Sequence, residues 1–284
     1  MGQRMFPLKA WLYGLAAVCI WCSIPLGVKW GAESLDWSWI LILRFMVSTV
    51  LFFPLVWRSF SKMIQTGPWV VPLGVLCLGM NYVFQTWAMT RLPVSLYTLT
   101  FTICPLLTLL SMNRRGSFVF WGGAILSMGG VWITLDWKTL SLNSTALPFL
   151  SLLGGMLAWV GVTHWMIRCE KHLSSVECTA WMQPLSLIGV LPIWSFRGSP
   201  IAMPTGPALV SVLLLGLGVP AAFWFYGRAL RENSQVSVAT QYLEPVIGCA
   251  IGILVLGEVL GPLQIAGGAL ILVGQLVLSR GLVQ

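Results

Sequence analysis

One carboxylate lies deep inside an apolar segment of the sequence. Glu244 is the only acidic residue well inside such a segment, and Ser237, Gln241 and Gly248 recur with it at helical spacing. This polar stripe suits a cavity or a partner helix. An ionised acid is expensive to bury in hydrocarbon, so Glu244 is a candidate for binding a proton or a polar substrate. The structural alternative is that Glu244 and Pro245 mark a helix kink, with the acid bonded to a backbone group that the proline leaves free.

Arg44 is a positively charged residue that also lies inside an apolar segment. It lies about 10 Å from one face of the hydrocarbon at 1.5 Å per residue, and Glu244 lies about 13 Å from the opposite face. Their levels differ by roughly 7 Å in a core of about 30 Å. Arg44 can therefore reach towards Glu244 or pair with a substrate carboxylate. The more common alternative is that such an arginine snorkels or binds carbonyl groups.

Polar side chains of two neighbouring segments extend this set of candidates. Asn81 and Gln85 share one helix face, with Tyr82 beside them. Tyr97 and Thr100 of the next segment would complete a polar wall. Hydrogen bonding inside a helix core is the alternative for each residue taken singly.

Two tryptophans and a histidine lie near the middle of their segments. Trp21 and Trp159 would stack on an aromatic or cationic substrate if they face a cavity, and helix packing is the alternative. His164 is able to titrate near neutral pH, or to serve only in packing and hydrogen bonding. The predicted substrate-binding residues are Trp21, Asn81, Tyr82, Gln85, Tyr97, Thr100, Trp159, His164, Gln241 and Glu244, with Arg44 as a further charged intramembrane residue. No metal or cofactor is expected.

Membrane helices must position these residues. Of the 284 residues, 57% are hydrophobic and 8% are charged, and the mean hydropathy is +0.87. A soluble domain carries roughly 25% charged residues, so the composition excludes a soluble protein. The net charge of +8 comes from cations scattered between apolar runs, which excludes a nucleic-acid-binding face.

Ten apolar segments are long enough to cross a bilayer, which takes about 20 helical residues. Their approximate limits are 9–29, 37–57, 68–89, 93–112, 116–136, 146–167, 175–196, 207–229, 235–256 and 261–279. Alternating them across the membrane from a cytoplasmic N-terminus places eleven Lys and Arg inside and four outside. This bias predicts that both termini are cytoplasmic.

The sequence also contains an internal repeat with an offset of about 140 residues. Trp21 then corresponds to Trp159, Pro105 to Pro245, and Gly122–Leu126, past a short insertion, to Gly267–Ile271. The predicted repeats are 9–136 and 146–280, with five spans each. Five is an odd number, so the second repeat enters the membrane from the opposite side, an arrangement typical of transporters.

The end of the second repeat resembles an EamA-type repeat of the drug/metabolite transporter superfamily. The residues that carry the resemblance are Tyr242–Val246, Leu256–Glu258 and Gln264–Gly274, and the first half is similar in Trp21, Arg44 and Pro105. The chain departs from the pattern where Arg114, Arg115 and Gly116 replace the acidic turn at Glu258. The resemblance implies ten helices around a cavity lined mainly by spans 1, 3, 4, 6, 8 and 9, and usually the export of small metabolites.

The expected protein is thus an all-α polytopic membrane protein of ten transmembrane helices in two inverted five-helix repeats. The expected function is a secondary transporter of the bacterial inner (plasma) membrane that exports amino acids or related metabolites. The alternatives are an organic-cation efflux antiporter and a membrane enzyme acting on lipid-linked substrates; for the enzyme the sequence offers no nucleophile elbow and no paired carboxylates. The expected partners are a small-molecule substrate and the bilayer, with no nucleic acid. A monomer is sufficient, and a homodimer is allowed.

Overall fold

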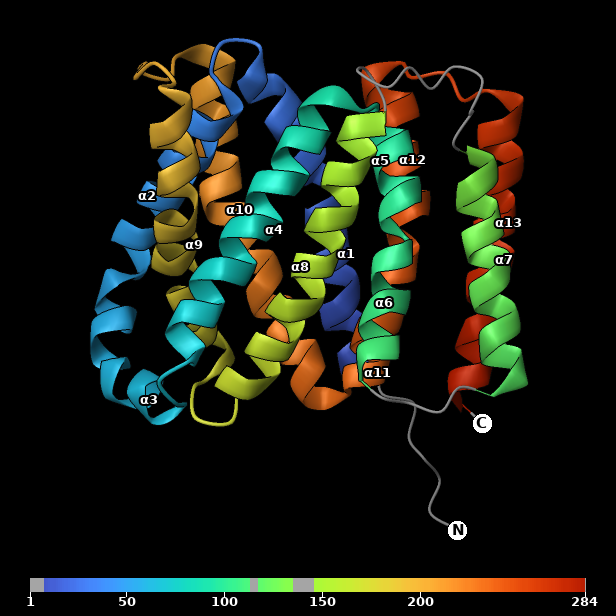
Figure 1. Cartoon of the computed structure of the whole chain (residues 1–284), viewed down its shortest axis with the longest axis horizontal. Coiled ribbons are helices and arrows are strands. Elements are labelled where there is room, and N and C mark those ends of the chain that lie inside the picture. Colours follow the sequence, from blue (N-terminus) through green and yellow to red (C-terminus); the bar gives the residue numbers. More distant parts are fainter. Residues whose placement is uncertain (1–7, 113–116, 135–145, 284) are drawn as a thin grey trace.

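The computed structural model describes residues 8–112, 117–134 and 146–283, and all regular structure in them is helical. Six helices are long and apolar enough to cross a membrane. They are α1 (Leu8–Ala32), α2 (Trp37–Arg58), α4 (Val70–Arg91), α8 (Leu147–Cys169), α9 (Ser175–Arg197) and α10 (Gly206–Glu232). They run side by side along one direction (Figure 1).

The remaining elements are shorter or broken. They are α3 (Phe60–Gln65), α5 (Val94–Phe101), α6 (Ile103–Ser111), α7 (Phe118–Thr134), α11 (Ser234–Thr240), the 3-10 turn η2 (Gln241–Leu243), α12 (Glu244–Leu256) and α13 (Pro262–Val283). The predicted spans 93–112 and 235–256 are therefore not continuous helices. Pro105 and Pro245 lie in the first turns of α6 and α12, where a missing backbone N–H does no harm.

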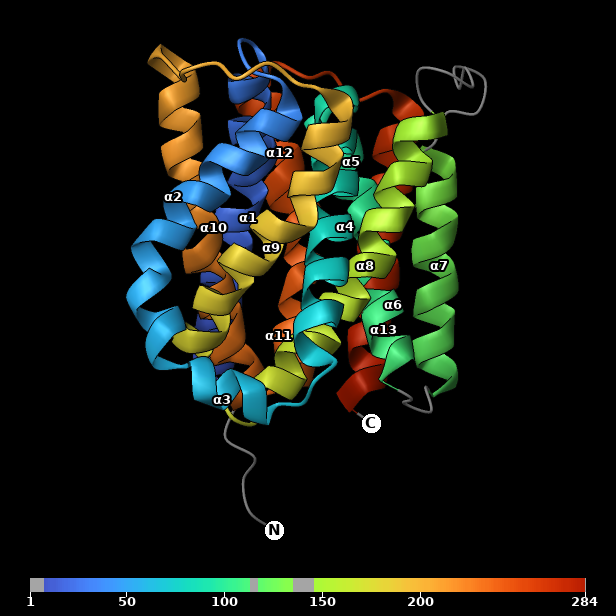
Figure 2. The ribbon, with the colours of Figure 1, turned by 60° about the vertical axis from the view of Figure 1, so that its left-hand side comes forward.

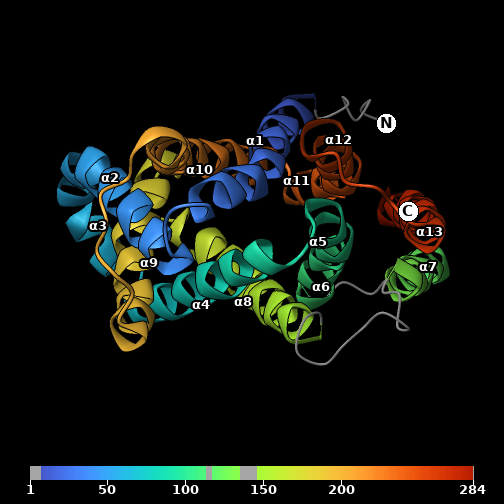
Figure 3. The ribbon, with the colours of Figure 1, turned by 90° about the horizontal axis from the view of Figure 1, so that it is seen from above.

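Helices from the two halves of the chain pack in pairs. The pairs in most extensive contact are α7 with α13, α1 with α10, α4 with α8, α2 with α9, α4 with α9, and α5 with α12. Each pair joins a helix that ends before residue 135 to one that begins after residue 146. Seen from above, α7 and α13 form the edge of the bundle, away from α2 and α3 (Figure 3). The core that surrounds the candidate residues is thus made by both halves together.

Glycine permits the closest of these contacts. A Cβ on Gly130 of α7 would lie 2.6 Å from the carbonyl oxygen of Gly267 of α13, and a Cβ on Gly267 would lie 2.5 Å from that of Gly130. Any side chain at either position would push the two helices apart. These glycines therefore serve close helix packing within one chain.

The outer surface of the bundle is apolar. Large side chains such as Leu12, Phe53, Leu150, Leu217 and Leu254 point outwards along the helices. A water-soluble protein seldom exposes so much contiguous apolar surface. This surface and the six long helices identify a membrane protein with several spans.

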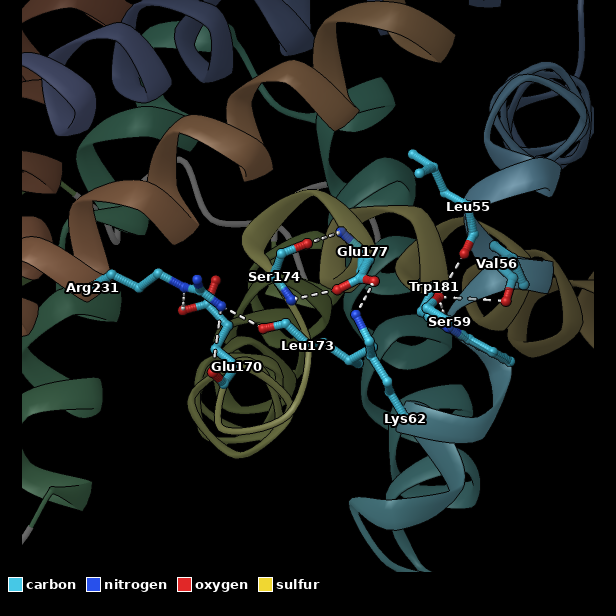
Figure 4. A network of polar contacts seen from close by, with 10 residues as sticks. All are labelled: Leu55, Val56, Ser59, Lys62, Glu170, Leu173, Ser174, Glu177, Trp181 and Arg231. Atoms are coloured by element: carbon cyan, nitrogen blue, oxygen red, sulfur yellow. Dashed lines mark hydrogen bonds and ion pairs between the residues drawn. The ribbon is translucent and has the colours of Figure 1, made fainter.

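Polar contacts tie the helices together at the end of the bundle that carries α3, which we call the α3 end (Figures 2 and 4). Lys62 Nζ lies 2.6 Å from Glu177 Oε1, and Arg231 Nε lies 3.5 Å from Glu170 Oε2. Ser174 caps α9 by accepting a hydrogen bond from the backbone N–H of Glu177. The opposite end, where α4 gives way to α5, is called the α5 end. Arg4, Arg114, Arg115 and Lys138, which contribute to the predicted orientation, lie outside the described residues.

Candidate functional site

A cavity lies between the helices of the two halves, and most of the predicted binding residues line it. Its walls come from α1, α2, α4, α5, α8, α10 and α12. The lining residues are Trp21, Cys22, Ile24, Pro25, Arg44, Asn81, Tyr82, Gln85, Thr86, Met89, Tyr97, Thr98, Phe101, Trp159, Val219, Phe223 and Glu244. The cavity has about 60 Å³ of space for water-sized molecules, enough for a few waters.

Glu244 enters the cavity from a break in the chain. The helix stops after Thr240, a 3-10 turn follows, and Glu244 is the first residue of α12. A carboxylate is favoured at that position because the free N–H groups and the dipole of a helix N-terminus are positive. Glu244 is 7% exposed, and among the residues whose side chains are described its carboxylate has no hydrogen bond or ion pair. The helix break predicted at Glu244 and Pro245 is therefore present. Within the described residues, however, the Glu244 carboxylate does not bond to a backbone group that the break leaves free.

Arg44 reaches the same cavity from α2, a helix absent from those that the family resemblance makes the main cavity walls. Its guanidinium carbon lies 4.5 Å from the ring centre of Phe45 and 4.6 Å from that of Tyr82. The residue is 2% exposed, and its Nε and Nη2 atoms have no hydrogen-bond partner in the part of the chain that the structure describes. Arg44 therefore does not snorkel. No ion pair joins it to Glu244 in the described residues.

The polar wall between these charges is a hydrogen-bonded chain. The hydroxyl of Tyr97 donates to Gln85 Oε1 at 2.7 Å, and Gln85 Nε2 donates to Asn81 Oδ1 at 2.5 Å. The chain connects α5 to two successive turns of α4. It fixes the two amides in one orientation, so the wall is organised before any ligand binds.

Aromatic rings make the remaining wall. Trp21 meets Trp159 edge to face with ring centres 5.3 Å apart, and Phe223 lies 5.7 Å and 5.6 Å from these two rings. The ring of Tyr226 lies 5.0 Å from Trp21. The rings from α1, α8 and α10 thus support one another, which gives the cavity a rigid apolar surface.

Three predicted residues do not line the cavity. The Thr100 hydroxyl donates to the Leu96 carbonyl oxygen of its own helix at 2.8 Å. His164 is exposed near the α3 end, where its Nε2 lies 2.8 Å from the hydroxyl oxygen of Ser111. Gln241 is 2% exposed in the 3-10 turn, and neither atom of its amide has a hydrogen-bond partner among the described side chains. The other predicted residues, Arg44 included, come together.

Phe223 is the most informative residue that sequence reasoning missed. An offset of 141, the one that aligns Ala88 with Ala229, aligns Tyr82 with Phe223, and both rings line the cavity. Extending the repeat through the third and eighth spans would have found it. No comparable signal marks Met89 or Phe101 in an apolar sequence.

Comparison with known families agrees with this architecture. The model of the EamA-like transporter family matches residues 8–136 and again residues 146–280. These segments include nearly the whole chain and every described residue of the cavity. The chain belongs to the EamA-like transporter family.

Two curated relatives of this EamA-like transporter are of the same type. A probable terminal-alkyne amino-acid exporter of Streptantibioticus cattleyicolor is 25% identical over 235 residues, which are 75% of this chain and 73% of the relative. An uncharacterised transporter, YwfM of Bacillus subtilis, is 23% identical over 265 residues, 92% of this chain and 78% of the relative. A solved crystal structure covers 97% of this chain and 99% of its own with a TM-score of 0.68 at 18% identity, which shows the fold alone.

Glu258 of this EamA-like transporter closes the α5 end beside the cavity. Its Oε1 accepts a hydrogen bond from the backbone N–H of Val94 at 2.7 Å, and Lys29 Nζ lies 3.3 Å from the same oxygen. Its Oε2 accepts from the backbone N–H and the hydroxyl of Ser95 at 2.9 and 2.7 Å. Partial burial opposes ionisation, but the Ser95 and Val94 hydrogen bonds and the charge of Lys29 outweigh it and lower the pKa of Glu258.

The acidic turn at Glu258 is largely shielded from water. The Glu258 side chain is 14% exposed, and its contacts join the loop after α12 to α1 and α5. The two oxygens satisfy N–H groups at the start of α5, where a helix leaves its first donors free. Glu258 is therefore a clamp between the halves of the chain.

Removing the clamp should lower stability in a pH-dependent way. We expect Glu258→Gln to cost about 1–3 kcal/mol at pH 7, because buried donors lose a charged acceptor. The folded-state pKa of Glu258 is lowered from 4.5, so its contribution is complete above that value and is lost as the pH falls through the lowered pKa. Thermal unfolding of the purified protein at pH 7 and in acid measures the difference, which should shrink in acid.

Glu33→Gln is the matched control for this comparison. Glu33 is exposed, lies next to the end of α1 and makes no contact in the described residues. Its replacement should leave the melting temperature unchanged at both pH values. Equal melting temperatures for wild type and Glu258→Gln at pH 7 would show that the clamp contributes nothing.

Proposed function

We propose that the protein is a secondary transporter with ten membrane spans, arranged as two inverted five-helix repeats at 9–136 and 146–280. In this proposal α5 with α6, and α11 with η2 and α12, each form one broken span. Two separate matches to one family model support the repeat. The pairing of α1 with α10 and of α8 with α4 supports it too, because an exchange of the two halves turns one pair into the other.

We infer that the substrate is a zwitterion, an amino acid or a related metabolite. The observation that carries this inference is that Arg44 and Glu244 line one cavity without pairing with each other. An amino acid presents a carboxylate and an ammonium a few ångströms apart. Arg44 would hold the carboxylate through its free guanidinium atoms, and Glu244 would hold the ammonium.

The other walls fit the remaining parts of such a substrate. Trp21, Trp159 and Phe223 offer an apolar surface to the side chain of the substrate. The amides of Gln85 and Asn81 offer polar atoms that can form hydrogen bonds with the substrate and orient it. The printed name of one relative, a probable terminal-alkyne amino-acid exporter, points in the same direction. Export of amino acids or related metabolites is therefore the function we assign.

The same geometry provides a coupling mechanism. Glu244 is the sole acid among the described residues that line the cavity. One carboxylate that binds either a proton or the substrate ammonium exchanges them as the cavity opens alternately to each side. Such exchange would let a proton gradient drive export, with no ATP site required.

An organic-cation antiporter is the second candidate, because aromatic rings surround the acid as they do in sites for quaternary ammonium groups. The buried charge of Arg44 in the same cavity opposes it. An uptake screen in proteoliposomes over amino acids, nucleosides and organic cations, with and without a pH gradient, separates the two. Uptake of amino acids alone supports our assignment, and uptake of cations alone overturns it.

The proposal places the α3 end in the cytoplasm, since Lys9, Arg58, Lys62, Arg168 and Lys171 lie near that end. Reporter fusions should therefore score inside at Gln284 and outside in the segment 138–146. The positive-inside bias is the physical reason. An extracellular Gln284 would refute this topology. It would also show that the α3 end does not lie on the inner side of the plasma membrane.

Each monomer contains a whole cavity built from both halves. A monomer is thus sufficient for transport in this proposal, and a homodimer is compatible with it. No cofactor takes part.

A further inference from the structure

A second, larger pocket lies at the α3 end, separate from the candidate transport cavity. It has a volume of about 600 Å³ and lies between the start of α4 and the end of α8. The lining residues are Thr66, Val70, Leu73, His164, Trp165, Ile167, Arg168, Lys171 and His172. None of them belongs to the cavity that holds Glu244.

Basic side chains dominate the polar part of this pocket. Arg168 and Lys171 carry positive charge, and the imidazoles of His164 and His172 lie in the same wall. No Asp or Glu is among the lining residues. Arg168 Nε donates to the carbonyl oxygen of Thr66 at 3.4 Å, which ties the guanidinium to the loop before α4.

Two other cations of the α3 end have acidic partners, whereas Lys9 and Arg58, which have none among the described residues, lie outside the pocket. Lys62 is paired with Glu177, and Arg231 with Glu170 (Figure 4). Arg168 and Lys171 have no acidic partner among the described residues. Their charge is therefore uncompensated and concentrated in one concave site, which favours an anion.

An apolar wall faces these cations. Val70, Leu73 and Ile167 line the same pocket, and Leu73 is 43% exposed on the outer surface of the bundle. Trp165 packs at the back, where its indole N–H donates to the carbonyl oxygen of Val70 at 2.8 Å. The site thus presents positive charge beside surface suited to hydrocarbon, at the end of membrane-spanning helices.

We propose that this pocket binds the phosphate headgroup of an anionic phospholipid, with the acyl chains passing over Leu73 and Ile167. Basic pockets between helices at a membrane surface suit such headgroups, since each Lys or Arg adds to the attraction. The bound lipid bridges α4 and α8, the two helices that carry Asn81 and Trp159 to the transport cavity. This inference does not depend on the identity of the transported substrate.

Native mass spectrometry of the purified full-length protein tests the proposal. Titration with phosphatidylglycerol should show tight binding of one lipid, and phosphatidylcholine should bind far more weakly. Lys171→Gln should weaken phosphatidylglycerol binding about fivefold, and Arg168→Gln with Lys171→Gln about thirtyfold. Lys171→Gln keeps the result interpretable if loss of Arg168 disturbs folding, because the exposed Lys171 side chain makes no hydrogen bond or ion pair in the described residues.

Lys9→Gln with Arg58→Gln is the matched control, since it removes two exposed cations near the same end outside the pocket. It should leave the tight binding unchanged. Equal binding of the two lipids, or equal losses in the pocket and control variants, would overturn the proposal.

Glycerol 1-phosphate at millimolar concentration should not displace the lipid. Displacement would assign the pocket to a soluble phosphate instead and overturn the lipid assignment.

Discussion

Replacing Glu244 with glutamine should abolish accumulation driven by a pH gradient. The change keeps the shape of the side chain and removes the one acid of the cavity lining that can exchange a proton for a substrate ammonium. Passive exchange should stay measurable at raised substrate concentration, because the helices that alternate access are unchanged. Uptake and counterflow in the same proteoliposomes measure both quantities with the amino acid that the screen identifies.

The size of this effect follows from burial. Loss of one partner of a buried charge pair costs about 2–5 kcal/mol, which is about 30-fold or more in affinity. Glu232→Gln is a matched control, because Glu232 is exposed at the end of α10 and makes no contact in the described residues. If Glu244→Gln accumulates substrate with the wild-type pH dependence, Glu244 is a structural residue beside Pro245.

Replacing Arg44 should remove the recognition of a carboxylate. We expect Arg44→Gln to weaken amino-acid binding about 30-fold or more. The amide of the same amino acid, which lacks the carboxylate charge, should be affected little. The preference of the transporter for the amino acid over its amide should therefore disappear. Competition between the two compounds in an exchange assay measures this preference.

Arg44 also packs against Phe45 and Tyr82, so its loss needs a structural control. Arg44→Lys keeps the charge and loses the planar fork, so it should retain part of the preference for the acid. A monodisperse elution profile for both variants would exclude misfolding. An unchanged preference in Arg44→Gln would show that the arginine does not touch the substrate.

Most of the residues singled out in the sequence line one cavity, whereas two of the predicted spans are broken helices. Glu244 and Arg44 stand out because an intramembrane charge is costly, whatever the exact fold. Asn81, Gln85 and Tyr97 were found from helical spacing within α4 and α5, which are regular there. Helical spacing is reliable only while the helix continues.

Gln241 shows where this reasoning fails. A continuous helix through residues 235–256 would place Gln241 and Glu244 on one face. The 3-10 turn at Gln241–Leu243 changes the rotation per residue, so only Glu244 reaches the cavity. Thr100 lies outside the cavity for another reason, because the lining residues Tyr97, Thr98 and Phe101 mark a face of α5 that Thr100 does not share.

Contacts between distant segments were beyond the sequence. Glu258 follows a helix end, a place where water normally solvates a carboxylate. Only the fold brings Lys29 and Ser95 to it from the other half of the chain. The separation of Arg44 from Glu244 is of the same kind, since it depends on how α2 packs beside α4 and α10.

Competition by matched triplets tests the zwitterion site most directly. Each triplet comprises an amino acid, its amide without the carboxylate charge, and its analogue without the amino group. Exchange of the labelled amino acid in proteoliposomes is measured against each competitor. A site between Arg44 and Glu244 predicts that only the intact amino acid competes, with both analogues at least about tenfold weaker, since each lacks one charged contact worth about 1.4 kcal/mol or more. If the amide competes as well as the amino acid, Arg44 holds no carboxylate and the central claim is wrong.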